Sequence, residues 1–393
     1  MAVQYQGDAA GTGGTVNTSG GVTTHLFTTV GSASSLNLSG LNLNTRLGAV
    51  QTGVISGSGN LSFSGPGTLS LNAANTHTGT TRAVAGTLNF ADVDAVAAST
   101  LDMNAADAGS VGFTLSNQTY NVGGLQGSRD LAVGNNNSLS IGANNASTTY
   151  SGAMSGSGGL TKVGTGTMNL TGANAYIGGT TVSAGTLLVN GSLSNSAVTV
   201  GNGGTLGGSG ALGALVTVQS GGVLSPGNSP GALAAAALDL QFGSTTLMQV
   251  IGSGSAAGFA GTDYDQIRIT TSGGLTYGGS LNLNFGNSSQ LLFLNGTVFD
   301  LFAFTGSPID HFSSVVSSGT GLYANLNFSR TGGIWTSTIG GQLLSFSELT
   351  GRLSISGSAV PEIDPAMGAN ALSLIAGVLA MIEQRRRRAA LVA

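Results

Sequence analysis

The stretch Ser151–Asn190 decides the fold, and it reads SGAMSGSGGLTKVGTGTMNLTGANAYIGGTTVSAGTLLVN. In this stretch short apolar runs alternate with Gly, Thr, Ser and Asn, and one residue is charged. A weaker copy lies upstream: Ser56–Leu88 aligns without a gap to Ser155–Leu187, with 17 identities in 33 positions. Internal repetition of this kind indicates a fold built by stacking similar units.

A shorter period runs through both copies and beyond them. The tripeptide Gly-Thr-Leu, or a close relative of it, begins at Gly48, Gly67, Gly86, Gly166, Gly185, Gly204 and Gly222. Neighbouring spacings are 19, 19, then 19, 19 and 18, and the longer interval from Gly86 to Gly166 has room for four further units. A strand rises about 3.3 Å per residue, so one unit traces roughly 60 Å, which suits one turn of a three-sided coil.

These spacings predict an all-β fold, a parallel β-helix (β-solenoid) with about 19 residues per coil. Within each short strand the apolar residues alternate, as in Met168 and Leu170, and helical spacing is absent from this region. The hairpins of a β-sandwich would instead place turn signals about every 8–12 residues. About ten coils between Gly48 and Gly243, at ~4.8 Å each, predict a rod of roughly 50 Å.

The corners of the coil are expected at Gly and Asn. Asn75 and Asn174 occupy equivalent positions in the two copies, ahead of Gly79 and Gly178. Gly reaches positive φ without a steric penalty, and Asn does so more readily than most residues. The sequence therefore predicts that both asparagines are corner residues.

Composition excludes several classes of protein. Gly makes up 67 of the 393 residues and charged residues 7%, whereas disordered chains combine low hydrophobicity with high net charge. The net charge is −4, and it becomes −8 without the run Arg385–Arg388, which leaves seven basic and 15 acidic residues. A body with the single lysine Lys162 is unsuited to nucleic acid, because phosphate binding requires clustered Lys and Arg. Cysteine is absent, which excludes disulfides and thiolate metal sites.

Four segments are expected. Residues 1–46 form an N-terminal β or capping segment, and residues 47–245 form the parallel β-helix. Residues 246–356 lose the period, hold longer alternating strands and most aromatics, and are expected to form a C-terminal β cap. Residues 357–393 are a tail in which an uncharged, mostly apolar span, 366–382, precedes the arginine run. Counted from Pro365 the span is about 27 Å long as a helix, so it predicts a short terminal transmembrane-type helix.

Few residues suggest chemistry. Gly208–Gly213 fits G-x-G-x-x-G, but it leads into a strand and no acid follows at the spacing that a dinucleotide site requires, so no cofactor is expected. The three histidines, His25, His77 and His311, are dispersed and predict no metal site. His77 stands at the position of Tyr176 in the second copy and is interpreted as a repeat variant.

Two pairs of acids carry the alternative hypothesis of an enzyme. Asp92/Asp94 and Asp263/Asp265 are spaced i, i+2, so on a strand both members would face the same side. Paired carboxylates are what glycoside hydrolysis requires. A polysaccharide lyase or hydrolase on a β-helix would use one of these pairs, whereas the simpler interpretation is solvated loop acids.

The two copies resemble autotransporter-associated β-strand repeats, also called passenger-associated transport repeats. The family pattern is close to K-x-G-x-G-x-L-x-L-x-G-x-N-x-Y-x-G-G-T-x-V-x-x-G-x-L. It is matched here, with Met168 in place of the first Leu as a mild departure, by Lys162, Gly164, Gly166, Leu170, Gly172, Asn174, Tyr176, Gly178, Gly179, Thr180, Val182, Gly185 and Leu187. The upstream copy departs at Phe63, Ala73, His77 and Thr80. The resemblance covers roughly residues 53–245 and implies a right-handed parallel β-helix exported from a Gram-negative cell.

The tail resembles a PEP-CTERM sorting signal, which combines a Pro-Glu-Pro-like motif, a hydrophobic span and a basic end. The matching residues are Val360, Pro361, Glu362, Arg385, Arg386, Arg387 and Arg388, while Ile363 replaces the second proline. This resemblance implies recognition by an exosortase-like sorting enzyme and contact with the membrane through residues 360–388. A signal peptide normally begins such proteins, and none is visible in MAVQYQGDAAGTGG.

The sequence therefore predicts a non-enzymatic, exported protein of the cell surface or extracellular space. The β-helix is expected to act as a structural or adhesin-like rod, with transient inner-membrane anchoring by the C-terminal helix. A polysaccharide or another surface ligand is a possible partner. No cofactor, metal or nucleic acid is expected.

Overall fold

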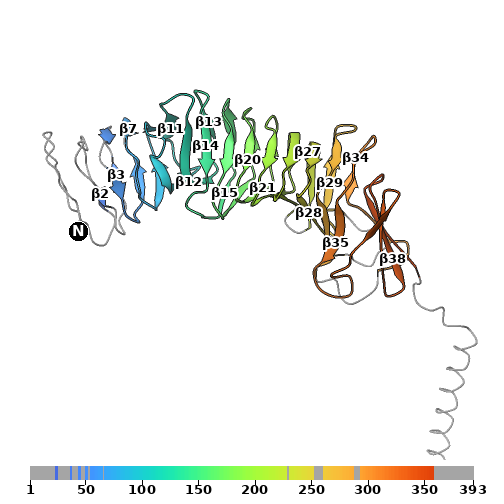
Figure 1. Ribbon diagram of the computed structural model, residues 1–393. Coiled ribbons are helices and arrows are strands. Elements are labelled where there is room, and N and C mark those ends of the chain that lie inside the picture. The colour runs from blue at the N-terminus through green and yellow to red at the C-terminus, as the bar shows by residue number, and fades with distance from the viewer. Residues whose placement is uncertain are drawn as a thin grey trace, which may run out of the picture.

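The computed structural model describes residues 54–64, 66–227, 230–251, 260–286 and 293–357, and the backbone of four short strands, 23–24, 36–37, 43–45 and 49–51. The protein is an elongated stack of β coils with its strands lying across the long axis, and an antiparallel sheet closes one end (Figure 1). This is the predicted all-β parallel solenoid.

Each coil has three sides, and strands on one side pair in parallel with those of the next coil. Side 1 contains the first half of β12 (Thr119–Gly127), β14 (Ser138–Ile141), β17 (Leu160–Lys162), β20 (Thr180–Val182), β23 (Val198–Val200) and the second halves of β25 (Ala211–Val218) and β27 (Ala232–Leu240). Side 2 contains β15 (Thr148–Tyr150), β18 (Thr167–Leu170), β21 (Gly185–Val189), β24 (Gly204–Gly208), β26 (Val223–Pro226) and β28 (Thr245–Gln249). Side 3 contains β13 (Leu131–Val133), β16 (Met154–Gly156), β19 (Ala173–Asn174), β22 (Ser192–Leu193) and the first halves of β25 and β27.

Register confirms the period of the sequence. Met168 pairs with Leu187, and Leu187 with Leu206, so the spacing of the Gly-Thr-Leu tripeptides is also the length of these coils. Following partners from Leu61 of β6 (Leu61–Phe63) to Thr246 of β28 takes nine steps. The region between the copies has longer coils, because loops such as 104–109 are inserted at its corners.

Inward-facing residues fill the solenoid. Strands on every side alternate between buried and partly exposed positions, as the period of two requires. Side chains of successive coils stack into apolar rows, such as Leu170 on Val189 and Val182 on Val200, all fully buried. Because each coil covers the next, the core is one continuous column.

The two sequence copies lie on different sides of the solenoid. Five steps along the ladder from Leu61 reach Met168, yet the sequence counterpart of Leu61 is Leu160, which lies on side 1. The distance between the copies is therefore not a whole number of coils, and the second copy is displaced by one side. The repeat specifies local strand and corner structure, since the same sequence serves on either side.

The sequence predicted that Asn75 and Asn174 are corner residues favoured by their tolerance of positive φ, and this prediction is wrong. Neither adopts positive φ, and both are buried, with 3% and 1% exposure. The Asn174 side chain accepts a hydrogen bond from Met154 N (3.0 Å) and donates to Gly172 O and Ser192 O, so it links successive coils. Asn75 likewise accepts from Ile55 N (2.8 Å) and donates to Ala95 O (3.0 Å). Their role is to satisfy backbone groups where short strands end.

Position 178 requires glycine because the neighbouring coil approaches it closely, and not because of its φ. A Cβ on it would lie 2.3 Å from the carbonyl carbon of Gly158 in the preceding coil. Gly185 is a true corner, with φ of 62°. The glycines of the repeat therefore serve two purposes, tight stacking and positive φ.

Parallel coiling continues past residue 246, but the coils become longer. Thr246 pairs with Leu281 of β31 (Ser280–Asn284), and Leu281 with Val315 of β35 (Ser314–Ser318), so each coil here uses nearly twice as much chain as a coil of the repeats. A five-stranded antiparallel sheet follows, in the order β32 (Val298–Asp300), β39 (Arg352–Gly357), β38 (Gln342–Ser347), β37 (Ile334–Ile339) and β36 (Ser329–Thr331). Buried aromatics pack beneath it, among them Phe302, Phe312 and Phe346. This sheet covers the end of the stack (Figure 1).

Among the described residues there is no helix long and apolar enough to cross a membrane. The predicted terminal helix and most of the predicted segment 1–46 lie outside the described residues.

Replacing Asn174 by Ala tests the bridging role. The change leaves the buried Met154 N–H without its acceptor, and we expect a loss of about 1–3 kcal/mol of unfolding free energy. Urea denaturation measures this loss. The matched control is Asn195→Ala at an exposed position, which should leave the midpoint within error. Equal effects of both changes would contradict the bridging role.

Candidate functional surface

A notch lies at the corner between sides 1 and 2. It encloses about 610 Å³ and is lined by Ala74, Asn75, Thr76, Thr78, Asp94, Ala97, Ala98, Thr100, Ala143, Asn144 and Ala146. Asp94 is the one acid among these residues, and the others are small or uncharged. Such a lining suits a neutral, polar ligand better than an anion.

At the notch the chain crosses this corner without a loop, since β10 (Val96–Met103) and β12 each run from side 1 to side 2 as one strand. Strand β12 runs straight from side 1 to side 2 through Gly123 and Gly124, whereas the following coil carries the turn 143–146. A Cβ on Gly123 would lie 2.7 Å from the Ala98 carbonyl carbon, so the coil stacks tightly there. Above these glycines Asn144 donates from Nδ2 to Thr100 Oγ1 (2.8 Å), a bond that spans two coils.

The first acid pair does not present two carboxylates to the notch. Asp92 does not line it, and its Oδ1 accepts the backbone N–H of Asp94 (2.8 Å) in a local turn. The Asp94 carboxylate accepts a hydrogen bond from Asn121 Nδ2 (2.6 Å). Asp92 therefore has a structural contact, and Asp94 contributes one carboxylate to the site.

The second pair is also separated. Asp265 is buried, with 2% exposure, and its two oxygens accept Gly231 N and Gln249 N, each at 2.7 Å. Burial raises its pKa to about 6. Asp265 lines a cavity of about 260 Å³, whereas Asp263 does not. Neither pair places two carboxylates in one pocket within the described residues, so the geometry required for glycoside hydrolysis is not formed there.

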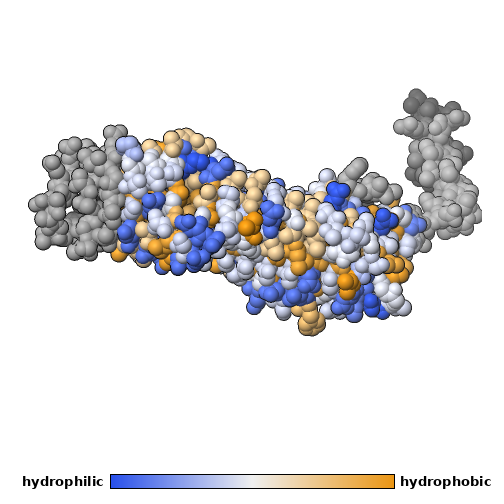
Figure 2. All heavy atoms as spheres, turned by 90° about the horizontal axis from the view of Figure 1, so that it is seen from above, coloured by the Kyte–Doolittle hydropathy of each residue, from blue (hydrophilic) through white to orange (hydrophobic). Residues whose placement is uncertain are grey.

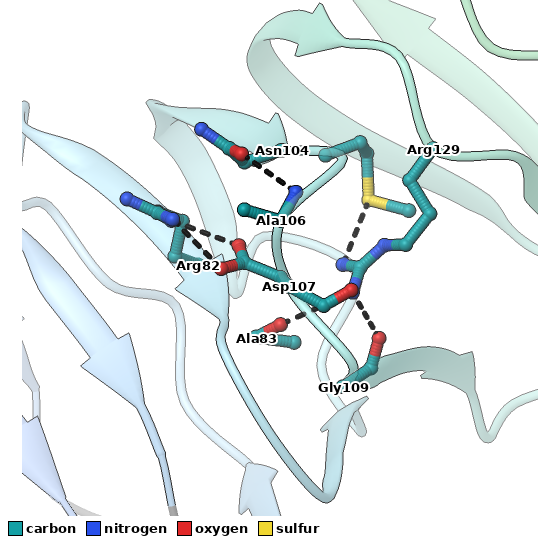
Figure 3. A network of polar contacts seen from close by, with 8 residues as sticks. Arg82, Ala83, Asn104, Ala106, Asp107, Gly109 and Arg129 are labelled. Carbon is teal, nitrogen blue, oxygen red and sulfur yellow. Dashed lines mark hydrogen bonds and ion pairs between the residues drawn. The ribbon is translucent and has the colours of Figure 1, made fainter.

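An arginine network that the sequence did not predict fastens the loop 104–109 beside the coils (Figure 3). Arg82 donates two hydrogen bonds to Asp107, at 2.7 and 2.8 Å, and the Asp107 side chain is 2% exposed. Arg129, from a later coil, donates to the backbone oxygens of Ala83, Asp107 and Gly109. Both guanidinium groups are used within the protein, which indicates a structural role.

The two copies share a chain of polar groups inside the solenoid. In the second copy Tyr176 OH contacts Thr180 Oγ1 (2.7 Å), which contacts Ser196 Oγ (2.7 Å). In the first, His77 Nε2 contacts Thr81 Oγ1 (2.8 Å), which contacts Ser99 Oγ (2.8 Å). His77 is fully buried, its Nδ1 has no hydrogen-bond partner among the described residues, and burial lowers its pKa to about 4. His77 therefore takes the position of Tyr176 in the first copy and makes the equivalent contact with a threonine hydroxyl.

Lys162, the single lysine of the sequence, points into the corner of its coil. It is 1% exposed and its Nζ donates to the backbone oxygens of Val163 (2.7 Å), Gly164 (2.9 Å) and Ala184 (3.2 Å). Burial lowers its pKa. The lysine therefore caps carbonyls of two coils and contributes no charge to the surface.

A row of threonines follows side 1. In register, Thr161 pairs with Thr181, Thr181 with Thr199, and Thr199 with Thr217, so their side chains are partly exposed on the outer face of successive coils. Ser140 precedes Thr161 in the row. Within the described residues the four threonine hydroxyls have no hydrogen-bond partner. Sequence reasoning missed the row because the spacing of these threonines becomes visible only once register is known.

The threonine row itself is uncharged, and in the next coil the position in register with Thr217 is the partly exposed Asp239. Between residues 131 and 238 the sequence contains one Asp, Glu, Lys, Arg or His, and this residue is the buried Lys162. Figure 2 shows pale colours of intermediate hydropathy over much of the visible face of the body, interrupted by blue and orange patches. The middle of the rod therefore presents hydroxyls, amides and apolar groups, and the large exposed ones among the latter are Ile177 and Leu215.

The remaining residues that the sequence singled out are the histidines and the residues of the sorting motif. Within the described residues no group of three His, Cys, Asp or Glu side chains is placed to hold a metal ion. His311 is exposed and its Nδ1 lies 2.8 Å from Asp310. The sorting residues Val360, Pro361, Glu362 and Arg385–Arg388 lie outside the described residues, as does His25.

Comparisons with known proteins support the repeats. Residues 63–90 and 160–189 match the family model for the passenger-associated-transport-repeat. The chain is also similar to the adhesin BmaC autotransporter of Brucella suis biovar 1 (strain 1330), with 36% identity over 104 residues. That similarity covers 26% of this chain and 3% of the relative. The two segments are therefore repeats of the passenger-associated type, and the chain matches only a small part of the length of this relative.

Replacing His77 by Tyr tests the polar chain. Because the imidazole has a pKa near 4 when folded and about 6.5 when unfolded, its stabilising contribution is complete above pH 6.5 and is lost as the pH falls toward 4. The difference corresponds to roughly 3 kcal/mol, and a tyrosine would remove it while keeping the contact with Thr81. We expect the melting temperature of His77→Tyr to fall less than that of the wild type between pH 7 and pH 5.

The matched control is His311→Tyr at the exposed histidine, which should follow the wild type. An unchanged pH dependence in His77→Tyr would show that His77 is not buried as a neutral group.

Proposed function

We propose that the protein is a non-enzymatic, adhesin-like rod of the cell surface or extracellular space, coiled in the right-handed sense. The observation that carries the proposal is the match of two segments to passenger-associated transport repeats within one continuous parallel solenoid. The similarity to an autotransporter adhesin supports the same function.

The fold suits such a rod. Each coil is bonded to the next through its backbone, so the stack is stiff and displays its outer sides repeatedly along its length. The described pockets offer no pair of carboxylates, which gives the alternative of a polysaccharide lyase or hydrolase no geometric support. The proposal therefore assigns function to the outer surface of the rod.

The tail is proposed to direct sorting. Its Pro361-Glu362 motif, apolar span and arginine run are suited to recognition by an exosortase-like enzyme after transient anchoring in the inner membrane. The arginines would remain on the cytoplasmic side and the solenoid on the other.

Cell fractionation with surface protease access tests the role of the tail. The intact protein is compared with a version lacking residues 359–393 and with Arg385–Arg388 replaced by Gln. We expect the intact protein to be accessible to protease at the cell surface, and both variants to be misplaced, because the span or its basic end is lost.

The matched control is Arg352→Gln, which removes a positive charge from the body of the protein. Unchanged location of the deletion variant would refute sorting by the tail.

A further inference from the structure

The notch and the threonine row form one continuous surface. Asp94 lines the notch and accepts a hydrogen bond from Asn121 (2.6 Å), and Asn121 pairs in register with Ser140. Ser140 pairs with Thr161, the first threonine of the row. The row therefore begins at the rim of the notch and leads away from it along side 1.

We propose that this surface binds a neutral polysaccharide, with one end of the sugar chain in the notch and its length along Ser140, Thr161, Thr181, Thr199 and Thr217. This inference rests on the proposed surface role and names the class of ligand that the surface recognises.

The spacing of the row supports a polymer. Neighbouring coils are ~4.8 Å apart, so the row offers one side-chain hydroxyl about every 4.8 Å along the rod. That interval is close to the length of one hexopyranose unit in an extended chain. Each threonine hydroxyl can donate one hydrogen bond and accept others, which matches the hydroxyls of a sugar.

The flanks of the row leave space for a chain. Two positions before the first three threonines, the sequence has Gly159, Gly179 and Ala197. Because these side chains are absent or a single methyl group, no long side chain stands beside the first three threonines on this flank. Leu215, which is 45% exposed, occupies the same position relative to Thr217 and is the one large side chain on this flank.

The lack of positive charge along the row selects the ligand, since the charged groups at its two ends, Asp94 and Asp239, are both acids. Residues 131–238 expose no Asp, Glu, Lys, Arg or His side chain, so an anionic polymer finds no cation there. Asp94 at the notch accepts hydroxyl hydrogens and repels anions. A neutral glycan loses no ionic hydration on binding such a surface.

The size of the row argues against a second copy as its occupant. From Ser140 to Thr217 the row extends about 20 Å and is one strand face wide, which gives on the order of 150 Å². A stable protein interface buries about 800 Å² on each partner, and its centre is enriched in aromatic residues. A narrow hydroxyl row suits a single sugar chain.

The test is retention of the full-length protein on cellulose and chitin and its binding to soluble dextran, with alginate as the anionic comparison. One variant replaces all four row threonines by valine: Thr161→Val, Thr181→Val, Thr199→Val and Thr217→Val. Valine keeps the shape and strand preference of threonine and removes the hydroxyl. The matched control makes the same change on side 2 at Thr167, Thr186 and Thr205, which also form a register row. A third variant, Ala143→Trp, fills the notch from an exposed position on its rim.

We expect the wild type to bind at least one of the three neutral glycans, equally at about 0.1 M and 1 M NaCl, since no ion pair is involved. The side 1 variant should bind at least about tenfold more weakly, because several hydrogen bonds are lost together. Ala143→Trp should also weaken binding, and the side 2 variant should stay within about twofold of the wild type. Circular dichroism and melting temperature verify that each variant is folded.

The inference is overturned if none of the three neutral glycans is bound, if alginate alone is bound, or if both rows of threonines contribute equally. Sedimentation showing that the side 1 row instead joins two copies would also overturn it. Failure of binding by a protein that is correctly displayed at the surface would leave the proposed function standing, whereas misplacement of a protein that binds sugar would contradict the proposed function alone.

Discussion

The structure depends on the hydrogen bonds between the backbones of successive coils. They hold neighbouring coils ~4.8 Å apart, which leaves no room for side chains where corners of one coil rest on the next. Gly158 shows this constraint: a Cβ there would lie 1.6 Å from the Asn137 carbonyl oxygen. The high glycine content therefore follows from stacking, with positive φ needed at a subset of corners.

The same constraint explains the polar groups inside the protein. Short strands end at each corner and leave backbone groups that are buried by the next coil, so each needs a partner. Asn75, Asn174 and Lys162 provide partners from side chains within the stack. The chain from Tyr176 through Thr180 to Ser196 satisfies hydroxyls in the same way. Lys162 is the one charged residue between residues 131 and 238, and because it is used to bond backbone carbonyls it is buried and not displayed on the surface.

The sequence predicted the fold class, the coil length and the repeats because these depend on the spacing of residue types along the chain, which can be seen without knowing which strands pair. It did not predict that equivalent strands of the two copies lie on different sides of the solenoid. The loops between the copies lengthen the coils there, so a separation counted in residues does not give a separation counted in coils. The sequence placed Asn174 near the end of a strand but gave it the wrong role. An asparagine that adopts positive φ and an asparagine whose side chain bonds two coils cannot be distinguished from residue type and position alone. The threonine row and the Arg82–Asp107 contact escaped prediction because their members meet only through register across separated coils. The sequence spacing of the acid pairs did not show which member would reach a cavity, and in the structure Asp94 and Asp265 each line one while Asp92 and Asp263 do not.

The central claim is the parallel stacking that brings Thr161, Thr181, Thr199 and Thr217 into one row. The absence of cysteine allows spin labels to be placed at Thr161→Cys and Thr217→Cys in an otherwise unchanged protein. Three coil steps separate these positions, so the account predicts a distance between their backbones of about 15 Å by electron paramagnetic resonance. A distance beyond about 25 Å would contradict the stacking, because three steps between four neighbouring parallel strands cannot span it.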